Sequence, residues 1–584
     1  MAKEFYIKKQ SGTYTEALEA FGVANLLYEI LERSKQIGYK ITIKDLGQSY
    51  LAETNKDITD ELIQALPYFQ VIKFIKKETN TPIPAGITDY FDYPTNKAEQ
   101  DRYKTEFKRI ESDKTKNAEQ KRAARKALND QKLSEFGRSL DAEYDVYREI
   151  KLNPYTSFTN LFNNFHQNQD RFQELIKTIL NYYSTQQNPM LNFQLVETSP
   201  TAQQLYNPNQ GKGLNKAKAN NASMGNLDGF WIPETMKISG ALSFMVSQYV
   251  KVGSGYDLKI YVPEFNEINL REARQLIFDF KKYLKSASPV KLDILNSLNF
   301  TIKFIQHTPV YTGKVRRTIK GFHSVYQKDL GQNKAVANIS FVGTPDFVSY
   351  TNRDEGHEWI EILENQRNLI SKIDEQGDAM QGLQNYRNFI GGTGNSALEY
   401  FNDFSYWYAG YLMQKLSKGN RFVKTFEPKH LTKFYKNMNT QELSLSSIIE
   451  NDGFQAVAKA IRYSTVKIQY NKEYWEKKVG LKTRYGLAQE LQNKAKSKED
   501  LATFIGEFIG TYNAETARNA EKNDGKAFRA NVKDEELVQF YSLLDSKPAR
   551  LIGALLASYG FALNKKEAPK DEEQDDETNE ENEQ

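Results

Sequence analysis

The chain has 584 residues, no cysteine, and 79 Lys and Arg against 75 Asp and Glu, a formal net charge of +4. The absence of cysteine excludes disulfides, cysteine-ligated zinc sites and thiol nucleophiles. Aromatic residues make up 12% of the chain, more than a disordered protein carries, so a folded protein is expected. Because single cores stop growing with length, the chain is expected to form roughly two to four domains.

The acidic residues concentrate at one end of the chain. Residues 564–584 hold ten Asp and Glu and three Lys, a net charge of −7, so the rest of the chain carries +11. This tail has no apolar residue able to anchor it after Leu563 and is predicted to be disordered. The cationic surplus elsewhere is compatible with phosphate binding, although a soluble surface beside an acidic tail explains it equally.

Neither a secretion signal nor a membrane span is predicted. The first residues lack the apolar core of a signal peptide. The chain has no run of about eighteen apolar residues that could cross a bilayer. A cytoplasmic protein without membrane contacts is therefore expected.

Patterns in the first part of the chain alternate between helix and strand. Apolar residues three or four apart predict a helix over 14–34. The charged stretch 97–138 is predicted as a solvated helix, with a helix along a nucleic-acid backbone as the alternative. A helix is expected to start at Pro233, whose fixed φ suits a first turn, and to run to Tyr249. Alternating apolar residues predict strands at 39–43, 258–262, 298–305 and 337–341.

After about Asp354 the periodicity is helical almost throughout. Its most aromatic stripe has a helical spacing and is predicted to lie in the core; it comprises Leu398, Phe401, Phe404, Tyr408, Tyr411 and Leu412. The predicted fold class is α+β, with a mixed α/β N-terminal body followed by a C-terminal helical bundle. The expected boundaries are 1–350 for the body, 351–563 for the bundle and 564–584 for the acidic tail.

Two segments come near to catalytic motifs but lack residues that the chemistry needs. The segment 354–358, Asp-Glu-Gly-His-Glu, is followed by Glu361 where a helical zinc site requires a second His. An acidic helix N-terminus explains it better. The glycine-rich segment 390–395 lacks the Lys-Ser or Lys-Thr of a P-loop and is interpreted as a loop between helices. We therefore predict no catalytic residue, no metal and no cofactor.

Three clusters of basic residues are candidates for nucleic-acid contacts. The first lies in a long loop rich in Gly and Asn, where ammonium groups can pair with phosphates and amides can bond to base edges; it comprises Gln210, Lys212, Asn215, Lys216 and Lys218. The second comprises Lys314, Arg316, Arg317 and Lys320. The third comprises Arg462, Lys467, Lys472, Lys477, Lys478, Lys482 and Arg484. Tyr470, Tyr474 and Trp475 interleave the third cluster and can stack unpaired bases. For each cluster alone, a solvated surface is an equally good explanation.

Several motifs resemble the large subunit of type I CRISPR surveillance complexes (Cascade). They are Gln-Gly-Lys-Gly-Leu-Asn-Lys at 210–216, Gly-Phe-Trp-Ile-Pro-Glu at 229–234 and Met-Lys-Ile-Ser-Gly at 236–240. The C-terminal stretch is similar as well, at 484–487, 508–513 and 557–560. The order of an α/β body and a helical bundle also fits. The resemblance covers the last two-thirds of the chain.

The resemblance implies a protein without catalysis of its own. In that family the large subunit reads a short motif beside the target, opens the duplex, holds the displaced strand with its helical bundle and docks a separate helicase–nuclease. The implied partners are CRISPR RNA, target DNA, the other Cascade subunits and that helicase–nuclease. We assign duplex or guide contacts to the 210–218 loop and the displaced strand to the 462–484 cluster. The zinc-bearing branches of the family are not matched, because the chain has no cysteine.

Two other functions remain open on the sequence. One is a nuclease that uses Asp354, Glu355 and His357 with a divalent ion. The other is a structural or scaffolding protein whose basic clusters only balance charge.

Overall fold

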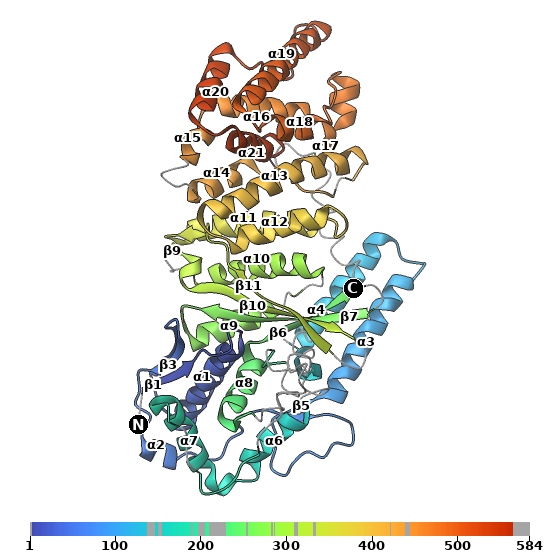
Figure 1. Ribbon diagram of the computed structural model, residues 1–584. Helices are drawn as coiled ribbons and strands as arrows, with labels where there is room; N and C mark the ends of the chain where they lie inside the picture. Colours follow the sequence, from blue (N-terminus) through green and yellow to red (C-terminus); the bar gives the residue numbers. More distant parts are fainter. Residues whose placement is uncertain are drawn as a thin grey trace, which may run out of the picture. The chain divides into compact units, whose positions relative to one another are not determined.

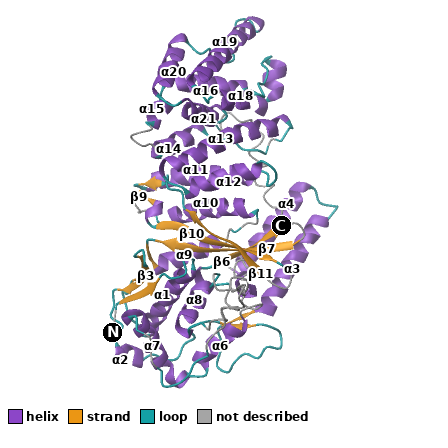
Figure 2. Cartoon of the chain, viewed as in Figure 1, coloured by secondary structure: helices purple, strands orange, loops and turns teal. Residues whose placement is uncertain are grey.

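The structure is a computed structural model that divides into two units. It describes residues 3–136, 146–149, 155–187, 191–196, 205–208, 229–252, 255–281, 284, 287–308, 313–330, 334–420, 422–438 and 444–564. The first unit comprises Met1–Pro289 and Arg316–Thr344, and the second comprises Val290–Val315 and Pro345–Gln584. The strands gather in the first part of the chain and helices make up the remainder (Figure 2), so the predicted α+β class is confirmed.

Two antiparallel four-stranded sheets organise the first unit (Figure 1). The first sheet has the order β1 (Glu4–Lys8), β3 (Ser49–Thr54), β2 (Ile41–Asp45) and β8 (Glu267–Asn269). The second has the order β11 (Lys334–Gly343), β10 (Ile319–Asp329), β7 (Gly255–Phe265) and β6 (Val246–Val252). A short parallel pair joins β4 (Phe74–Lys76) to β5 (Tyr90–Asp92). The helices are α1 (Thr15–Arg33), α2 (Asp60–Gln64), α3 (Tyr93–Ser112), α4 (Ala118–Phe136), α6 (Tyr155–His166), α7 (Phe172–Thr185), α8 (Trp231–Phe244) and α9 (Leu270–Lys281).

The helices α1 and α8 of the first unit cross in backbone contact. A Cβ atom on Gly22 would lie 1.9 Å from the carbonyl oxygen of Met236, and one on Gly240 would lie 1.9 Å from that of Leu18. Only glycine therefore allows the two backbones to touch at these points. The rings of Phe21 and Phe244 stack 3.8 Å apart beside the crossing. The predicted helix over 14–34 is confirmed as α1.

The second unit consists mainly of helices. These are α10 (Pro289–His307), α11 (Arg353–Ser371), α12 (Ala379–Gly391), α13 (Gly394–Ser417), α14 (Pro428–Asn437), α15 (Leu445–Ile449), α16 (Asp452–Ser464), α17 (Val466–Tyr470), α18 (Leu487–Lys494), α19 (Lys498–Lys522), α20 (Asp534–Ser546) and α21 (Ala549–Gly560). A two-residue pair links β9 (Gly313–Lys314) and β12 (Ser349–Tyr350). The aromatic stripe of α13 is buried as predicted, and Phe401 packs against Phe389 and Phe434.

The strand predicted at 298–305 is wrong, because these residues form the second half of α10. Leu298, Phe300, Ile302 and Phe304 are all buried, and so is Thr301 between them. A helix buried on nearly all sides has no polar face, and its amphipathic period disappears. Within an eight-residue window the remaining alternation imitates a strand.

The helix predicted from Pro233 to Tyr249 is wrong at its C-terminal end. It begins at Trp231, with Pro233 in its first turn, and stops at Phe244. Tyr249 lies in β6, where it pairs with Leu258 of β7. The β-branched residues Val246, Val250 and Val252 favour the strand, which apolar spacing alone did not reveal.

Candidate nucleic-acid interface

The first basic cluster, Gln210 to Lys218, lies outside the described residues. The structure describes the segments on either side of it, 205–208 and 229–231. The carbonyl of Leu205 accepts a hydrogen bond from the Tyr14 hydroxyl at 2.6 Å, and that of Tyr206 accepts one from Thr15 Oγ1 at 3.0 Å. The segment 205–208 is therefore held beside the first turn of α1, and 229–231 leads directly into α8.

A buried charged group lies beneath these segments. Lys237 Nζ lies 2.8 Å from Glu234 Oε1, and Glu234 Oε2 accepts a hydrogen bond from Asn207 Nδ2 at 2.8 Å. Tyr183 donates its hydroxyl to Glu19 Oε1 at 2.8 Å. Burial raises the pKa of Glu19 to about 7, against the opposing effects of Lys237 and Tyr183. Glu19 therefore titrates near neutral pH.

The residues of the second cluster are divided between the two units. Lys314 belongs to the second unit, where its Nζ lies 2.9 Å from Asp346. Arg316 and Arg317 belong to the first unit, where their backbone carbonyls accept hydrogen bonds from Asn266 Nδ2 at 3.2 and 2.9 Å. The Arg317 residue is exposed.

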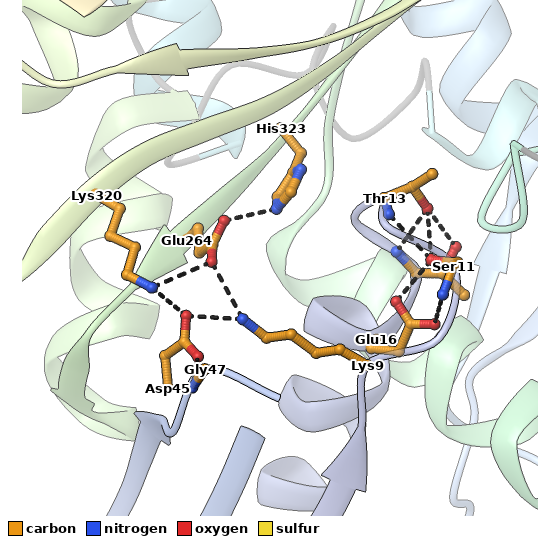
Figure 3. Close-up of polar contacts among 10 residues, drawn as sticks. Lys9, Ser11, Thr13, Glu16, Asp45, Gly47, Glu264, Lys320 and His323 are labelled. Atoms are coloured by element: carbon orange, nitrogen blue, oxygen red, sulfur yellow. Dashed lines mark hydrogen bonds and ion pairs between the residues drawn. The ribbon is translucent and has the colours of Figure 1, made fainter. Parts of the chain in front are cut away.

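Lys320 is part of an ionic network that links the two sheets of the first unit (Figure 3). The Asp45 carboxylate, fully buried, pairs with Lys320 and lies 2.8 Å from Lys9 Nζ. Glu264 Oε1 lies 3.4 Å from Lys9 Nζ and 3.5 Å from Lys320 Nζ, and its Oε2 lies 2.6 Å from His323 Nε2. Burial raises the pKa of Glu264, but His323, Asp45 and Lys9 outweigh this effect and hold it below its usual range. Lys320 is therefore already compensated by carboxylates.

The loop between β1 and α1, also drawn in Figure 3, supplies its own acceptor. The backbone N–H groups of Gln10 and Ser11 donate to Glu16 Oε1 at 3.2 and 2.8 Å. Ser11 Oγ donates to Glu16 Oε2 at 2.6 Å. Because the Glu16 carboxylate occupies these donors, the loop does not present them to a phosphate.

Two members of the third cluster stabilise the helical unit. Arg462, 8% exposed, donates from Nη2 to the carbonyl of Tyr559 at 2.8 Å. Arg484 Nη2 lies 2.9 Å from Glu515 Oε1, and its guanidinium lies over the ring of Phe508. These arginines join α16 to α21 and the segment before α18 to α19.

Four other lysines of the cluster are exposed around a single turn of π-helix, Glu473–Lys478. Tyr474 and Tyr485 lie among them, with 38% and 43% of their surface exposed. We call this group the basic–aromatic surface; it comprises Lys472, Tyr474, Lys477, Lys478, Lys482 and Tyr485. Lys472 Nζ donates to the Tyr485 hydroxyl at 3.0 Å, which raises the pKa of the lysine. Lys478 and Lys482 form no ion pair with any residue that the structure describes.

The π-turn is held by apolar packing on its inner side. Trp475 packs against a buried cluster of Ile468, Val479 and Leu481. The N–H of Val479 donates to the carbonyl of Tyr474 at 2.9 Å, five residues back. Trp475 and Val479 thus face the buried cluster, while Lys477 and Lys478 are exposed. Single π-turns of this kind are frequent at functional sites.

The sequence identified only part of the aromatic component. Tyr470 is buried and donates its hydroxyl to the carbonyl of Val423 at 2.8 Å. Lys467 is half-buried, with its ammonium 5.9 Å from the centre of the Tyr463 ring. Tyr485 was missed, although its place between Arg484 and a glycine marks it as a loop residue beside a cation.

The candidate nuclease residues Asp354, Glu355 and His357 lie in the first turns of α11. Asn352 Oδ1 caps this helix by accepting from the N–H of Glu355 at 3.0 Å. The Glu355 carboxylate accepts from the backbone N–H of Thr351 at 2.7 Å, and Arg353 Nε donates to His357 Nε2 at 3.3 Å. Within the described part of the chain, no three His, Asp or Glu side chains are grouped to hold a metal ion. The predicted acidic helix N-terminus is confirmed.

Comparison with known proteins adds no family. No protein-family model matches the chain, and no curated protein is similar to it. In the part of the chain that the structure describes, no helix combines the length and apolar character needed to cross a membrane.

Proposed function

We propose that this chain is the non-catalytic large subunit of a CRISPR RNA-guided DNA surveillance complex. In this proposal it recognises the motif beside the target, stabilises the displaced strand and docks a separate helicase–nuclease. The observation that carries the proposal is the basic–aromatic surface, where four exposed lysines and two exposed tyrosines lie within residues 472–485 of the helical unit.

The chemistry of this surface suits a single strand. Its ammonium groups can follow a phosphate backbone, and each tyrosine ring can stack an unpaired base with about 1–3 kcal/mol. Neither contact depends on base identity. This fits a displaced strand, because pairing with the guide RNA supplies the sequence discrimination in such a complex.

The packing of the first unit gives a physical reason for motif residues that carry the family resemblance. Gly240, which ends the motif 236–240, allows α8 to touch the backbone of α1. Trp231 and Ile232 of the motif 229–234 are buried at the start of α8. The 210–218 loop is thus flanked by anchored segments, a suitable base for duplex or guide contacts.

Binding of the full-length chain to labelled single-stranded and duplex DNA tests the proposal, both alone and with its co-expressed neighbour subunits. We expect K477A/K478A/K482A to weaken single-strand binding. The control K418A/K459A/K496A removes three exposed charges elsewhere in the same unit and should have little effect. We expect K212A/K216A/K218A to weaken duplex binding. No binding by the unmodified chain in either setting would contradict the proposal.

A further inference from the structure

Residues 571–584 form a strongly acidic segment with nine Asp and Glu and no Lys or Arg. They lie outside the described residues, but the point where the chain approaches them is described. Leu563 is buried, and its N–H donates to the carbonyl of Phe426 at 2.9 Å. The chain therefore leaves the helical unit at a fixed position next to Phe426.

This exit point lies close to the start of the basic–aromatic surface. Tyr470, two residues before Lys472, donates its hydroxyl to the carbonyl of Val423 at 2.8 Å. Val423 and Phe426 are three residues apart, at most about 11 Å even in a fully extended chain. The short segment from Val423 to Phe426 thus contacts both Leu563, where the chain leaves the helical unit, and the end of α17, which precedes the lysines.

The intervening chain is long enough to reach the surface. Eight residue steps separate Leu563 from Asp571, or about 26 Å when extended. The thirteen residues that follow Asp571 can span a further 43 Å or so. The basic–aromatic surface is built from only fourteen consecutive residues, 472–485, so the acidic segment can cover all of it.

The charges of the two parts are complementary. Lys478 and Lys482 carry no ion pair with the described residues, and Lys477 has only an exposed i,i+4 partner, Glu473, at 3.5 Å. Such exposed pairs contribute little and exchange easily. A run of carboxylates presents repeated negative charge, as a phosphate backbone does, but it offers no bases to stack on the tyrosines.

We propose that the acidic segment 571–584 docks on the basic–aromatic surface of its own chain and competes there with single-stranded nucleic acid. The identity of the competitor rests on the proposed function, whereas the docking does not. Tethering gives the segment an effective concentration in the millimolar range, so a weak intrinsic affinity is enough to hold it in place. A nucleic acid displaces it because base stacking adds to the ionic contacts.

Removal of the negative charge is the first test. In the full-length chain, a variant with the nine Asp and Glu of the segment changed to Asn and Gln keeps the length and removes the charge. We expect single-stranded DNA to bind about tenfold more tightly at low salt. The gain should disappear at high salt, where screening weakens both partners. Unchanged affinity at low salt would overturn the proposal.

A double-variant comparison tests where the segment acts. If the segment covers the basic–aromatic surface, neutralising it should bring no gain in the K477A/K478A/K482A background and the full gain in the K418A/K459A/K496A background. An equal gain in both backgrounds would mean that the segment acts through net charge or at another basic surface, and would overturn the proposal.

Zero-length cross-linking of the unmodified chain, without nucleic acid, separates this inference from the proposed function. A carbodiimide activates a carboxylate, and a lysine amine in contact with it then displaces the activating group to form an amide. We expect amides between residues 571–584 and Lys477, Lys478 or Lys482, and their loss when a single-stranded oligonucleotide is added. Cross-links spread evenly over exposed lysines such as Lys418 and Lys459 would contradict docking. Specific cross-links in a chain that binds no DNA would contradict the proposed function alone.

Discussion

Asp45 is the residue on which the ionic network of the first unit depends. Its carboxylate is fully buried between the ammonium groups of Lys9 and Lys320, which are 23% and 32% exposed. We expect Asp45→Ala to destabilise this unit by about 3 kcal/mol, because two ammonium groups lose a buried partner. Urea unfolding measures the change.

A matched control is Asp57→Ala, which breaks the exposed pair between Lys3 and Asp57. That pair should contribute less than about 1 kcal/mol. Equal destabilisation by both variants would show that the network around Asp45 has no special role.

Glu19 makes the stability of the first unit depend on pH. The folded protein holds the Glu19 proton up to a pKa of about 7, whereas an unfolded carboxyl releases it near 4.5. Stability should therefore fall as the pH rises through this interval and stay level above it, a loss on the order of 3 kcal/mol. We expect Glu19→Gln to remove this loss and to stabilise the unit at pH 8. Thermal unfolding at pH 5 and pH 8 checks it.

The control for Glu19 is Glu29→Gln on the same helix, where Glu29 pairs with Arg33 at 3.0 Å. It should leave the pH dependence unchanged. A pH profile that is the same for the unmodified chain and Glu19→Gln would contradict the raised pKa.

At the residue scale, the sequence predicts where cations gather but not which of them already have partners. Lys320, Arg462 and Arg484 resemble Lys478 and Lys482 in the sequence, yet only the first three are held by internal acceptors. Their acceptors Asp45, Tyr559 and Glu515 are distant in the sequence, so no local pattern distinguishes the two groups. Tertiary contacts decide which lysines remain available to a ligand.

At the scale of elements, the α1–α8 crossing depends on glycine at both points where the backbones touch. We expect Gly240→Ala to destabilise the first unit by about 3 kcal/mol, because its Cβ would collide with the Leu18 carbonyl. The control Gly410→Ala lies in α13 with no heavy atom within 4 Å of the added carbon. It should be neutral or stabilise by up to about 1 kcal/mol. Thermal unfolding measures both changes. An unfolding temperature of Gly240→Ala equal to that of the unmodified chain would contradict the close crossing.

The elements differ in how well their sequences predict them. The α1 helix and the α13 stripe were predicted because their apolar residues recur three or four positions apart over several turns. The α10 helix was mistaken for a strand because apolar residues alternate within the short window 298–305. The end of α8 was missed because strand pairing with β7, a tertiary effect, stops the helix.

At the scale of the whole molecule, the charge distribution connects the site with its proposed regulation. The formal net charge of the whole chain is +4, which is the sum of −7 in residues 564–584 and +11 in the rest. The small net charge therefore results from two opposite parts, a cationic folded region and an acidic segment that can shield some of its lysines. Composition revealed this asymmetry, whereas the exposed lysines and tyrosines around the π-turn required the structure.

The most direct test of the central claim is the salt dependence of single-stranded DNA binding by the full-length chain. Each lysine that neutralises a phosphate contributes about 0.7 to the slope of log K against log salt. We predict that K477A/K478A/K482A lowers the magnitude of this slope by about 2 and weakens binding, while K418A/K459A/K496A leaves the slope unchanged. Equal slopes for the unmodified chain and both variants would contradict the assignment of the basic–aromatic surface to a nucleic-acid strand.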